Sequence, residues 1–315
     1  MPSFPFLLLD VFTDQRFQGN QLAVFPAPQG LSAADMQAIA REMNFSESTF
    51  VFPAEGAPDA LGRVPAGAGR ARMRIFTPGT ELPMAGHPTI GSTFALAAEG
   101  TIEQGRRDFV FELGVGPTPV SLDWAGGQLS FAWMTQLLPA FGGTIADRAG
   151  FSAAIGVDER ELAADVPAQV VTCGVPYLLA PLTSRDAVDR VSIDRRALTR
   201  CFQQAGLEEV PTFFFTTAGK TEPDAAMTVY SRMLAPALGI AEDPATGSAS
   251  GPLGCYLVHY ELVDAEAAQR IVSLQGFAMG RPSRIHIAID ARDGGVSRVR
   301  VGGRAVMVGR GELHL

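Results

Sequence analysis

Short runs of apolar or alternating apolar and polar residues recur along the chain. Examples cover residues 7–13 (LLLDVFT), 211–217 (PTFFFTT) and 283–289 (SRIHIAI), and Gly, Pro, Asn or Asp residues punctuate the stretches between such runs. Runs of β-branched and aromatic residues are typical of strands. Few helical stretches interrupt them, which favours an α+β architecture of strongly curved sheets over the regular alternation of a Rossmann fold.

Three stretches predict helices. Residues 31–44 form an amphipathic pattern, with Ser32 as a suitable N-cap and Asp35 three residues later. The face that should be buried carries Met36, Ile39, Ala40 and Met43. We expect each sheet to carry one more prominent helix.

The first of these prominent helices is apolar nearly all round, so it should be buried. We expect Pro88 at its first helical position and Gly100 as its C-terminal stop. The second should begin within residues 246–251, with Pro252 in its first turn.

The stretches before these two helices resemble each other. Residues 74–92 (RIFTPGTELPMAGHPTIGS) and 232–251 (RMLAPALGIAEDPATGSASG) both open with Arg, two apolar residues, a small residue and Pro. The offsets are 232 − 74 = 158 and, at the small-residue turns Ala85 and Ala245, 245 − 85 = 160, about half the chain. The repeat predicts a duplicated fold with two lobes.

We expect an N-terminal lobe over residues 1–125, completed by strands from about 298–315, and a C-terminal lobe over residues 126–297. Residues 54–70 are rich in Ala, Gly and Pro and predict a mobile surface loop.

Composition excludes several classes of function. The net charge is −8 and no basic block occurs, so nucleic acid is not an expected partner. No window approaches 18 apolar residues, and the N-terminus lacks the basic region of a signal peptide. Three scattered cysteines without a CxxC spacing fit a reducing cytoplasm and argue against a disulfide framework or a zinc site.

The two apolar helix starts are candidates for binding an anion. A helix N-terminus offers unpaired N–H groups and the positive end of the helix dipole, and glycine lets a ligand approach the backbone. Gly86 and Gly247 lie at these starts, so a small carboxylate could be held without a metal. The alternative is that these glycines only permit close helix packing.

Four polar residues near these motifs could act chemically. Glu47 shares a period-two strand face with Phe45, Thr49 and Val51, so it is either an exposed edge group or a base with a raised pKa. His87 could be a simple cap, Asp243 before Pro244 a turn former, and Ser248 a cap. We expect the remaining histidines to be structural: His259, His286 and His314.

Several segments together resemble the phenazine-biosynthesis PhzF-like isomerases, a family with the diaminopimelate epimerase fold. The segments are DVFT…RFQGNQLAVF, NFSESTFVF, RIFTPGTELPMAGHPTIGS, EDPATGSASGPLGCYL and QGFAMGRPS, in order from Asp10 to Ser283. The resemblance implies two pseudo-symmetric lobes, each a curved, mostly antiparallel, barrel-like sheet around a central helix, with the active site between them. It also implies an isomerase without cofactor or metal, commonly a homodimer.

The resemblance assigns roles to individual residues. It implies that Glu47 shuttles a proton, that His87 and Asp243 are catalytic, and that Asn20 and Ser248 line the site. Related racemases of this fold carry a thiol or its substitute at each helix start. The corresponding residues here are taken to be Ala85 and Ala245, while Cys255 is expected in the core, which argues against a racemase with two thiol bases.

We therefore expect acid–base chemistry through Glu47 that moves a proton and a double bond on a small acid. A non-catalytic protein that binds a small acid and a lyase or dehydratase using the same base are the alternatives. We also expect residues 85–87 and 246–248 to face each other, with His87 held in an extended backbone before Pro88.

Overall fold

The computed structural model describes residues 2–54, 69–292 and 295–315. They form two compact units: unit 1 runs to Thr135 and resumes at Val301, and unit 2 covers Gln136–Arg300. The boundary expected after residue 125 falls at the turn between two strands of unit 1. Most of the loop expected over residues 54–70 lies outside the described residues.

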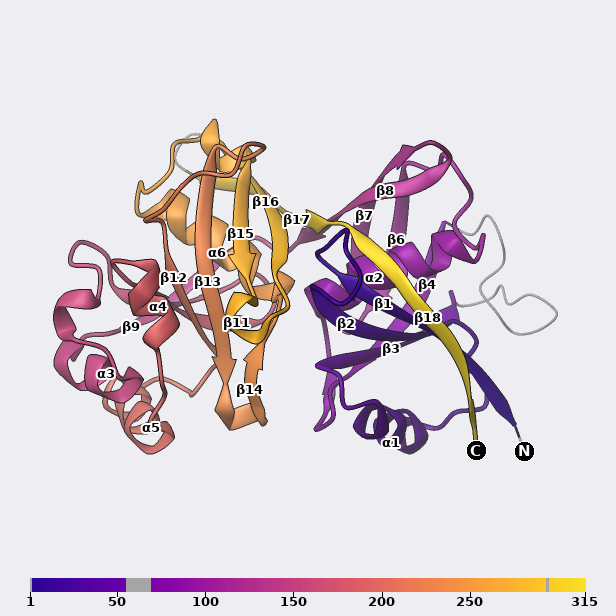
Figure 1. The fold of residues 1–315 in the computed structure, drawn as a ribbon, viewed down its shortest axis with the longest axis horizontal. Coiled ribbons are helices and arrows are strands. Elements are labelled where there is room, and N and C mark those ends of the chain that lie inside the picture. The colour runs from indigo at the N-terminus through magenta and orange to yellow at the C-terminus, as the bar shows by residue number, and fades with distance from the viewer. Residues whose placement is uncertain (1, 55–68, 293–294) are drawn as a thin grey trace. The chain divides into compact units, whose positions relative to one another are not determined.

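Unit 1 is built on a curved, mostly antiparallel sheet (Figure 1). The strands that pair in unit 1 are β1 (Ser3–Val11), β2 (Asn20–Phe25), β3 (Glu47–Pro53), β4 (Arg70–Phe76), β5 (Glu81–Leu82), β6 (Asp108–Leu113), β7 (Gly116–Ala125), β8 (Gln128–Gln136) and β18 (Ala305–His314). They pair in the order β18–β1–β2–β3–β4–β6–β7–β8, with β5 beside β4. Only the pairs β2–β3 and β4–β6 are parallel among these described pairings.

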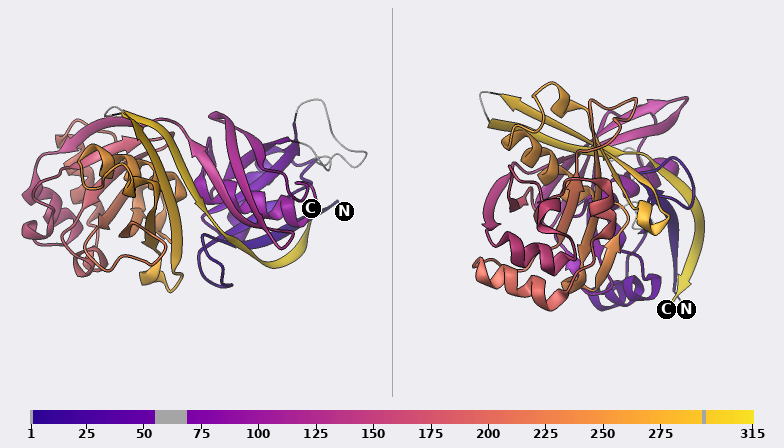
Figure 2. Two further views of the ribbon diagram at one scale, coloured as in Figure 1. Left: turned by 90° about the horizontal axis from the view of Figure 1, so that it is seen from above. Right: turned by 60° about the vertical axis from the view of Figure 1, so that its left-hand side comes forward.

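Two helices cover the faces of this sheet. Helix α1 (Ala33–Met43) begins at the predicted capping box of Ser32 and Asp35 and buries Met36, Ile39 and Ala40. It packs on the phenylalanine-rich face, where the rings of Phe25 and Phe50 stack at 4.8 Å. Helix α2 (Gly86–Ala98) packs against β1, β2, β3 and β18 and lies among the strands of unit 1 in Figure 1 and in the left view of Figure 2.

Unit 2 repeats this succession of strand pairs. Its strands are β9 (Ala140–Ile145), β10 (Ala168–Thr172), β11 (Pro176–Pro181), β12 (Thr212–Thr216), β13 (Met227–Ala235), β14 (Ile240–Asp243), β15 (Ile271–Gln275) and β16 (Ser283–Arg292), and β17 (Gly295–Gly303) returns the chain to unit 1. They pair in the order β9–β10–β11–β12–β13–β15–β16, with β14 beside β13. The pairs β11–β12 and β13–β15 are parallel, and they correspond to the parallel pairs β2–β3 and β4–β6 of unit 1.

Helices cover both faces of the unit 2 sheet. Helix α6 (Gly247–His259) packs on one face, and α3 (Arg148–Ile155), α4 (Arg185–Arg190) and α5 (Arg195–Gln204) gather on the other (Figure 1). Strand β12 is buried on both sides, since Phe213 and Phe215 join the α6 core while Phe214 joins the core of the outer helices. The sequence analysis did not predict α3, α4 or α5.

The shared pairing confirms the α+β fold with a duplicated sheet and central helix, and it fixes the register of the repeat. Helices α2 and α6 are both 13 residues long and begin at Gly86 and Gly247, an offset of 247 − 86 = 161. Each N-cap carbonyl accepts a hydroxyl from the first turn, from Thr89 to Ala85 at 2.8 Å and from Ser250 to Thr246 at 2.9 Å. The counterpart of Ala85 is therefore Thr246, and the expected match with Ala245 is wrong by one residue.

Three expectations about the prolines are also wrong. Pro88 is the third residue of α2, not the first, and His87 lies in the first helical turn, not in an extended backbone. Pro88 is tolerated there because the first four N–H groups of a helix have no intrahelical partner. Pro252 is the sixth residue of α6, beyond its first turn, which leaves the Ser248 carbonyl without its usual helical donor. In the described part of the chain, no helix has the length and hydropathy to cross a membrane.

Candidate active site

The start of α2 brings together three predicted site residues of unit 1. Asn20 opens β2, Glu47 opens the neighbouring parallel strand β3, and His87 is the second residue of α2. The Asn20 side-chain nitrogen lies 3.1 Å from His87 Nδ1, and Glu47 Oε2 lies 3.4 Å from His87 Nε2. One imidazole therefore lies between an amide and a carboxyl group.

Burial keeps His87 neutral. The side chain is 3% exposed, and loss of hydration lowers its pKa from 6.5 to about 3, against a hydrogen bond to the Gln21 backbone that raises it. The contact with Glu47 is thus between a neutral imidazole and the carboxyl group, not an ion pair. A neutral ring has one donor and one acceptor nitrogen, so it can help move a proton.

Glu47 occupies the α2 face of the sheet, as the period of two predicts. Its side chain is 12% exposed, and two residues further along β3 the Thr49 hydroxyl lies 2.9 Å from the Ser92 hydroxyl of α2. Phe45 was expected on this face, but it precedes the strand and packs on the α1 side. Glu47 is therefore a largely buried carboxyl group and not an exposed edge residue.

The start of α6 in unit 2 holds a second polar cluster. Asp243 ends β14 and is 4% exposed, and its Oδ2 accepts a 2.5 Å hydrogen bond from the Thr246 hydroxyl. The Gln275 side chain at the end of β15 donates to the Asp243 carbonyl and to the Thr246 hydroxyl and accepts from the Thr246 N–H. The turn before α6 is thus held by side chains from two strands.

Ser248 and Gly247 lie in the first turn of α6. The hydroxyl groups of Ser248 and Tyr177 are 2.7 Å apart, and the Gln136 amide donates to the Gly247 carbonyl at 2.9 Å. Neither α2 nor α6 is capped by the side chain of its own N-cap residue. Both helix starts are buried, and such starts are suited to an anionic ligand.

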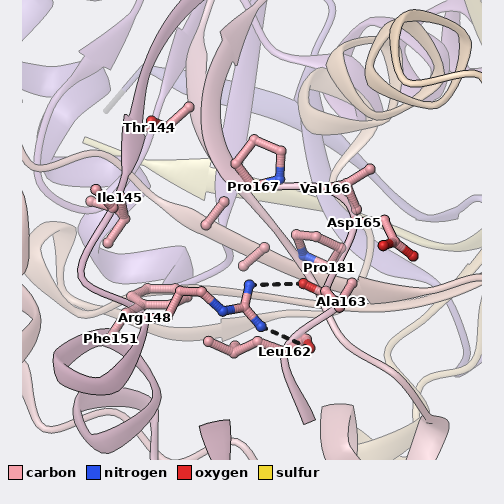
Figure 3. A pocket seen from close by; sticks show the side chains of 14 residues that line it. Thr144, Ile145, Arg148, Phe151, Leu162, Ala163, Asp165, Val166, Pro167 and Pro181 are labelled. Carbon is pink, nitrogen blue, oxygen red and sulfur yellow. Dashed lines mark hydrogen bonds between the residues drawn. The ribbon is translucent and has the colours of Figure 1, made fainter. Parts of the chain in front are cut away.

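A separate cavity in unit 2 contains none of the predicted site residues (Figure 3). It encloses about 290 Å³ between β9, α3 and the segment 162–168. Arg148 points into it and donates to the carbonyl groups of Ala163 and Leu162 at 2.8 and 3.1 Å. The guanidinium therefore connects α3 to the backbone of residues 162–163. This structural role makes the cavity a poorer candidate for an active site than the helix starts.

The predicted residues thus fall into one cluster in each unit: Asn20, Glu47, Gly86 and His87 in unit 1, and Asp243, Gly247 and Ser248 in unit 2. The sequence analysis missed the partners Thr246, Gln275 and Tyr177. Thr246 lies in the EDPATGS motif and Gln275 is the first residue of QGFAMG. Their separation of 29 residues does not predict that they are in contact.

The structure thus has a duplicated α+β fold with a cluster of polar residues at the start of each central helix. The chain belongs to the phenazine biosynthesis-like (PhzC-PhzF) family, whose model matches residues 9–311. It is an isomerase by the names of its relatives.

Three similar proteins illustrate this relationship. An uncharacterized isomerase of Mesorhizobium japonicum is 34% identical over 98% of both chains. The trans-2,3-dihydro-3-hydroxyanthranilate isomerase of Pseudomonas fluorescens is 33% identical over 98% of this chain and 99% of its own length. A solved PhzF-family structure from Bacillus anthracis has a TM-score of 0.83 at 23% identity, covers all of both chains and supports the fold.

Proposed function

We propose that the enzyme moves a proton, and with it a double bond, within a small carboxylic or amino acid without a cofactor or metal. Glu47 takes the proton from an activated carbon and returns it to another carbon of the same molecule. The observation that carries this proposal is the largely buried Glu47 carboxyl group 3.4 Å from the neutral ring of His87. A carboxylate and a neutral imidazole in contact are suited to general acid–base catalysis.

The other predicted residues bind and assist in this proposal. The first-turn N–H groups of α2 bind the substrate carboxylate beside His87, and Asn20 orients the ring. Asp243 is a second acid–base group, and Gly247 and Ser248 have a role in substrate binding. The resemblance to the PhzF-like isomerases supports these roles. The proposal also includes a homodimer, which analytical sedimentation tests, and a cytoplasmic location, which cell fractionation tests.

The name of one relative supports a proposal for the substrate class. The Pseudomonas fluorescens relative acts, by its name, on trans-2,3-dihydro-3-hydroxyanthranilate, a cyclic amino acid with a carboxylate and a hydroxyl group. We take a cyclic unsaturated amino or hydroxy acid of this kind as the substrate class of this chain.

Incubation of the purified protein with trans-2,3-dihydro-3-hydroxyanthranilate in D2O tests the proposal. We expect an isomer of the substrate, which carries one deuterium at the receiving carbon when the Glu47 carboxyl group exchanges its proton with solvent before it returns a proton to the substrate. Product that has lost water or ammonia would identify a lyase or dehydratase instead. Binding without any turnover, unchanged in Glu47→Gln, would identify a binding protein.

A panel of small cyclic and linear amino and hydroxy acids extends the assay. Addition of EDTA serves as a control, since we expect no loss of turnover. Inhibition by EDTA that added metal reverses would contradict the metal-free part of the proposal.

A further inference from the structure

The side chain of Gln275 is the origin of a directed hydrogen-bond chain that ends on Asp243. Gln275 is 0% exposed, and Asp243 and Thr246 are each 4% exposed. The Gln275 Oε1 accepts from the Thr246 N–H at 3.0 Å, while its Nε2 donates to the Asp243 carbonyl at 2.8 Å and to Thr246 Oγ1 at 2.9 Å. All three bonds of this amide are made within one turn.

The direction of each bond is fixed by chemistry. The Thr246 N–H can only donate, so the amide oxygen must face it, and the amide nitrogen must face the hydroxyl. Since Thr246 Oγ1 accepts from Gln275, its own hydrogen is left for Asp243 Oδ2, 2.5 Å away. A donated hydroxyl hydrogen favours the ionised form of a carboxyl group.

The threonine behaves unlike an ordinary helix cap. Threonine at an N-cap normally accepts a hydrogen bond from the second or third helical N–H. The Thr246 side chain makes no such bond, although it is the N-cap of α6. Its hydroxyl turns away from the helix and toward Asp243.

The duplicated half provides an internal comparison, because it has a helix start at the same place in the repeat. Strand register matches Asp243 with Leu82, since these residues lie opposite Met233 and Ile75. It matches Gln275 with Leu113 in the same way, at the ends of β15 and β6, one residue beyond the pairs Tyr230–Leu274 and Arg72–Glu112. In unit 1 an alanine, Ala85, stands at the N-cap. Ala85 is extended, at φ −150° and ψ 151°, where Thr246 has φ −109° and ψ 84°. A helix start at this place in the repeat therefore forms without the polar chain, and the fold does not require one there.

We propose that Gln275 is a positioning residue that, through the Thr246 hydroxyl, holds the Asp243 carboxylate ionised and in one orientation for the reaction. This inference rests on the role of Asp243 in the proposed function. Gln275 and Thr246 act on Asp243 and do not exchange a proton with the substrate.

Thr246→Val separates this role from structural support. Valine keeps the shape and the backbone bonds to Gln275 and removes only the hydroxyl. We expect kcat with trans-2,3-dihydro-3-hydroxyanthranilate to fall ten- to hundredfold, with KM changed less than threefold, and Thr246→Ser to restore most of kcat. Gln275→Leu, the residue type of unit 1, should lose at least as much. In an Asp243→Asn background, Thr246→Val should cost nothing further.

Ser283→Ala is the matched control. Its hydroxyl donates to the Pro244 carbonyl at 2.9 Å and so supports the same turn without reaching the carboxylate. We expect this variant to unfold at a lower temperature with an unchanged kcat. An equal loss of kcat in Ser283→Ala and Thr246→Val would overturn the inference in favour of structural support.

Two further results separate this inference from the proposed function. Full activity of Thr246→Val beside a large loss in Asp243→Asn would overturn the inference and leave the role of Asp243 intact, whereas full activity of Asp243→Asn would overturn both. A crystal structure of Thr246→Val decides the matter without any substrate. We expect the Asp243 carboxylate to turn to another rotamer, and an unmoved carboxylate would overturn the inference even if the wild type turns over no acid tested.

Discussion

The starts of α2 and α6 occupy the same place in the duplicated fold and differ in chemistry. Unit 1 has Glu47 and His87 at its helix start. The strand register matches Glu47 with Pro211 of unit 2, and the helix register matches His87 with Ser248. Unit 2 has its own polar set where unit 1 is apolar: Asp243, Thr246 and Gln275 in place of Leu82, Ala85 and Leu113. Duplication kept the two helix starts and divided the polar groups between them, so neither half repeats the acid–base set of the other.

The largest expected effect comes from removing the carboxyl group of Glu47, whose position in unit 2 is occupied by Pro211. Glu47→Gln keeps the shape and abolishes the base, so kcat should fall by roughly 10²- to 10⁴-fold, the usual contribution of general acid–base catalysis. Glu42→Gln, an exposed change on α1, is the control and should leave kcat unchanged. Near-normal kcat in Glu47→Gln would show that the helix start of unit 1 does not carry the base.

The second prediction concerns His87, which the comparison matches with a serine that does not titrate. Its folded pKa of about 3 lies below the ordinary 6.5, so the unfolded chain binds the proton first as the pH falls. The contribution of His87 to the free energy of unfolding should therefore be most favourable above pH 6.5, and it should decline as the pH falls from 6.5 toward 3. Over the range from pH 6.5 to 4 the loss from His87 is on the order of 3 kcal/mol.

Denaturant unfolding at several pH values measures this effect. His87→Gln removes the titration, so its stability should depend less steeply on pH than that of the wild type across this range. His314→Gln, at an exposed position near the C-terminus, is the control and should follow the wild type. Parallel pH curves for His87→Gln and the wild type would mean that His87 is not buried as a neutral ring.

The comparison also shows what the sequence could and could not predict. The Ser32–Asp35 capping box and the glycines at both helix starts are local patterns, so α1 and the duplication were predictable. The register of the repeat was not, because the bidentate pairs Arg74–Glu81 and Arg232–Glu242 enclose turns of different length. The offset thus grows from 158 before the turn to 161 after it, since 242 − 81 = 161, and Thr246 was missed as the match of Ala85.

Contacts made through the sheet were also beyond sequence reasoning. Gln275 meets Thr246 because β13 pairs with both β14 and β15, and no periodicity in the intervening residues encodes that contact. Tyr177 meets Ser248 across 71 residues for the same kind of reason. Glu47 and His87 were predictable only because each stands in a recognisable motif.

A smaller effect should follow from Tyr177→Phe. This variant tests whether Ser248 acts in substrate binding, in contrast to its counterpart His87, which is proposed to be catalytic. The change removes the hydroxyl 2.7 Å from Ser248 and keeps the buried ring. Loss of one hydrogen bond to a binding group is worth about 1 kcal/mol, so KM should rise roughly fivefold with little change in kcat. Tyr230→Phe, whose hydroxyl donates to Asp189, is the control and should not alter KM. A decrease in kcat with an unchanged KM would indicate that Ser248 acts in the chemical step and not in substrate binding.

The smallest effect is expected from the cysteines, and it tests whether the two helix starts work without a thiol. Cys255 is fully buried in α6, and its Sγ lies 3.9 Å from that of Cys173. The hydrogen bond with Cys255 and burial raise the pKa of the Cys173 thiol, so this thiol does not supply a thiolate base near neutral pH. Neither sulfur stands at a helix start, where the register puts Ala85 and Thr246. We therefore expect Cys255→Ala to keep kcat within twofold while losing about 1 kcal/mol of stability through the small cavity it leaves. A tenfold loss of kcat in a variant that still unfolds cooperatively would mean that a thiol takes part, and the division of acid–base groups between the two units would then have to include Cys255.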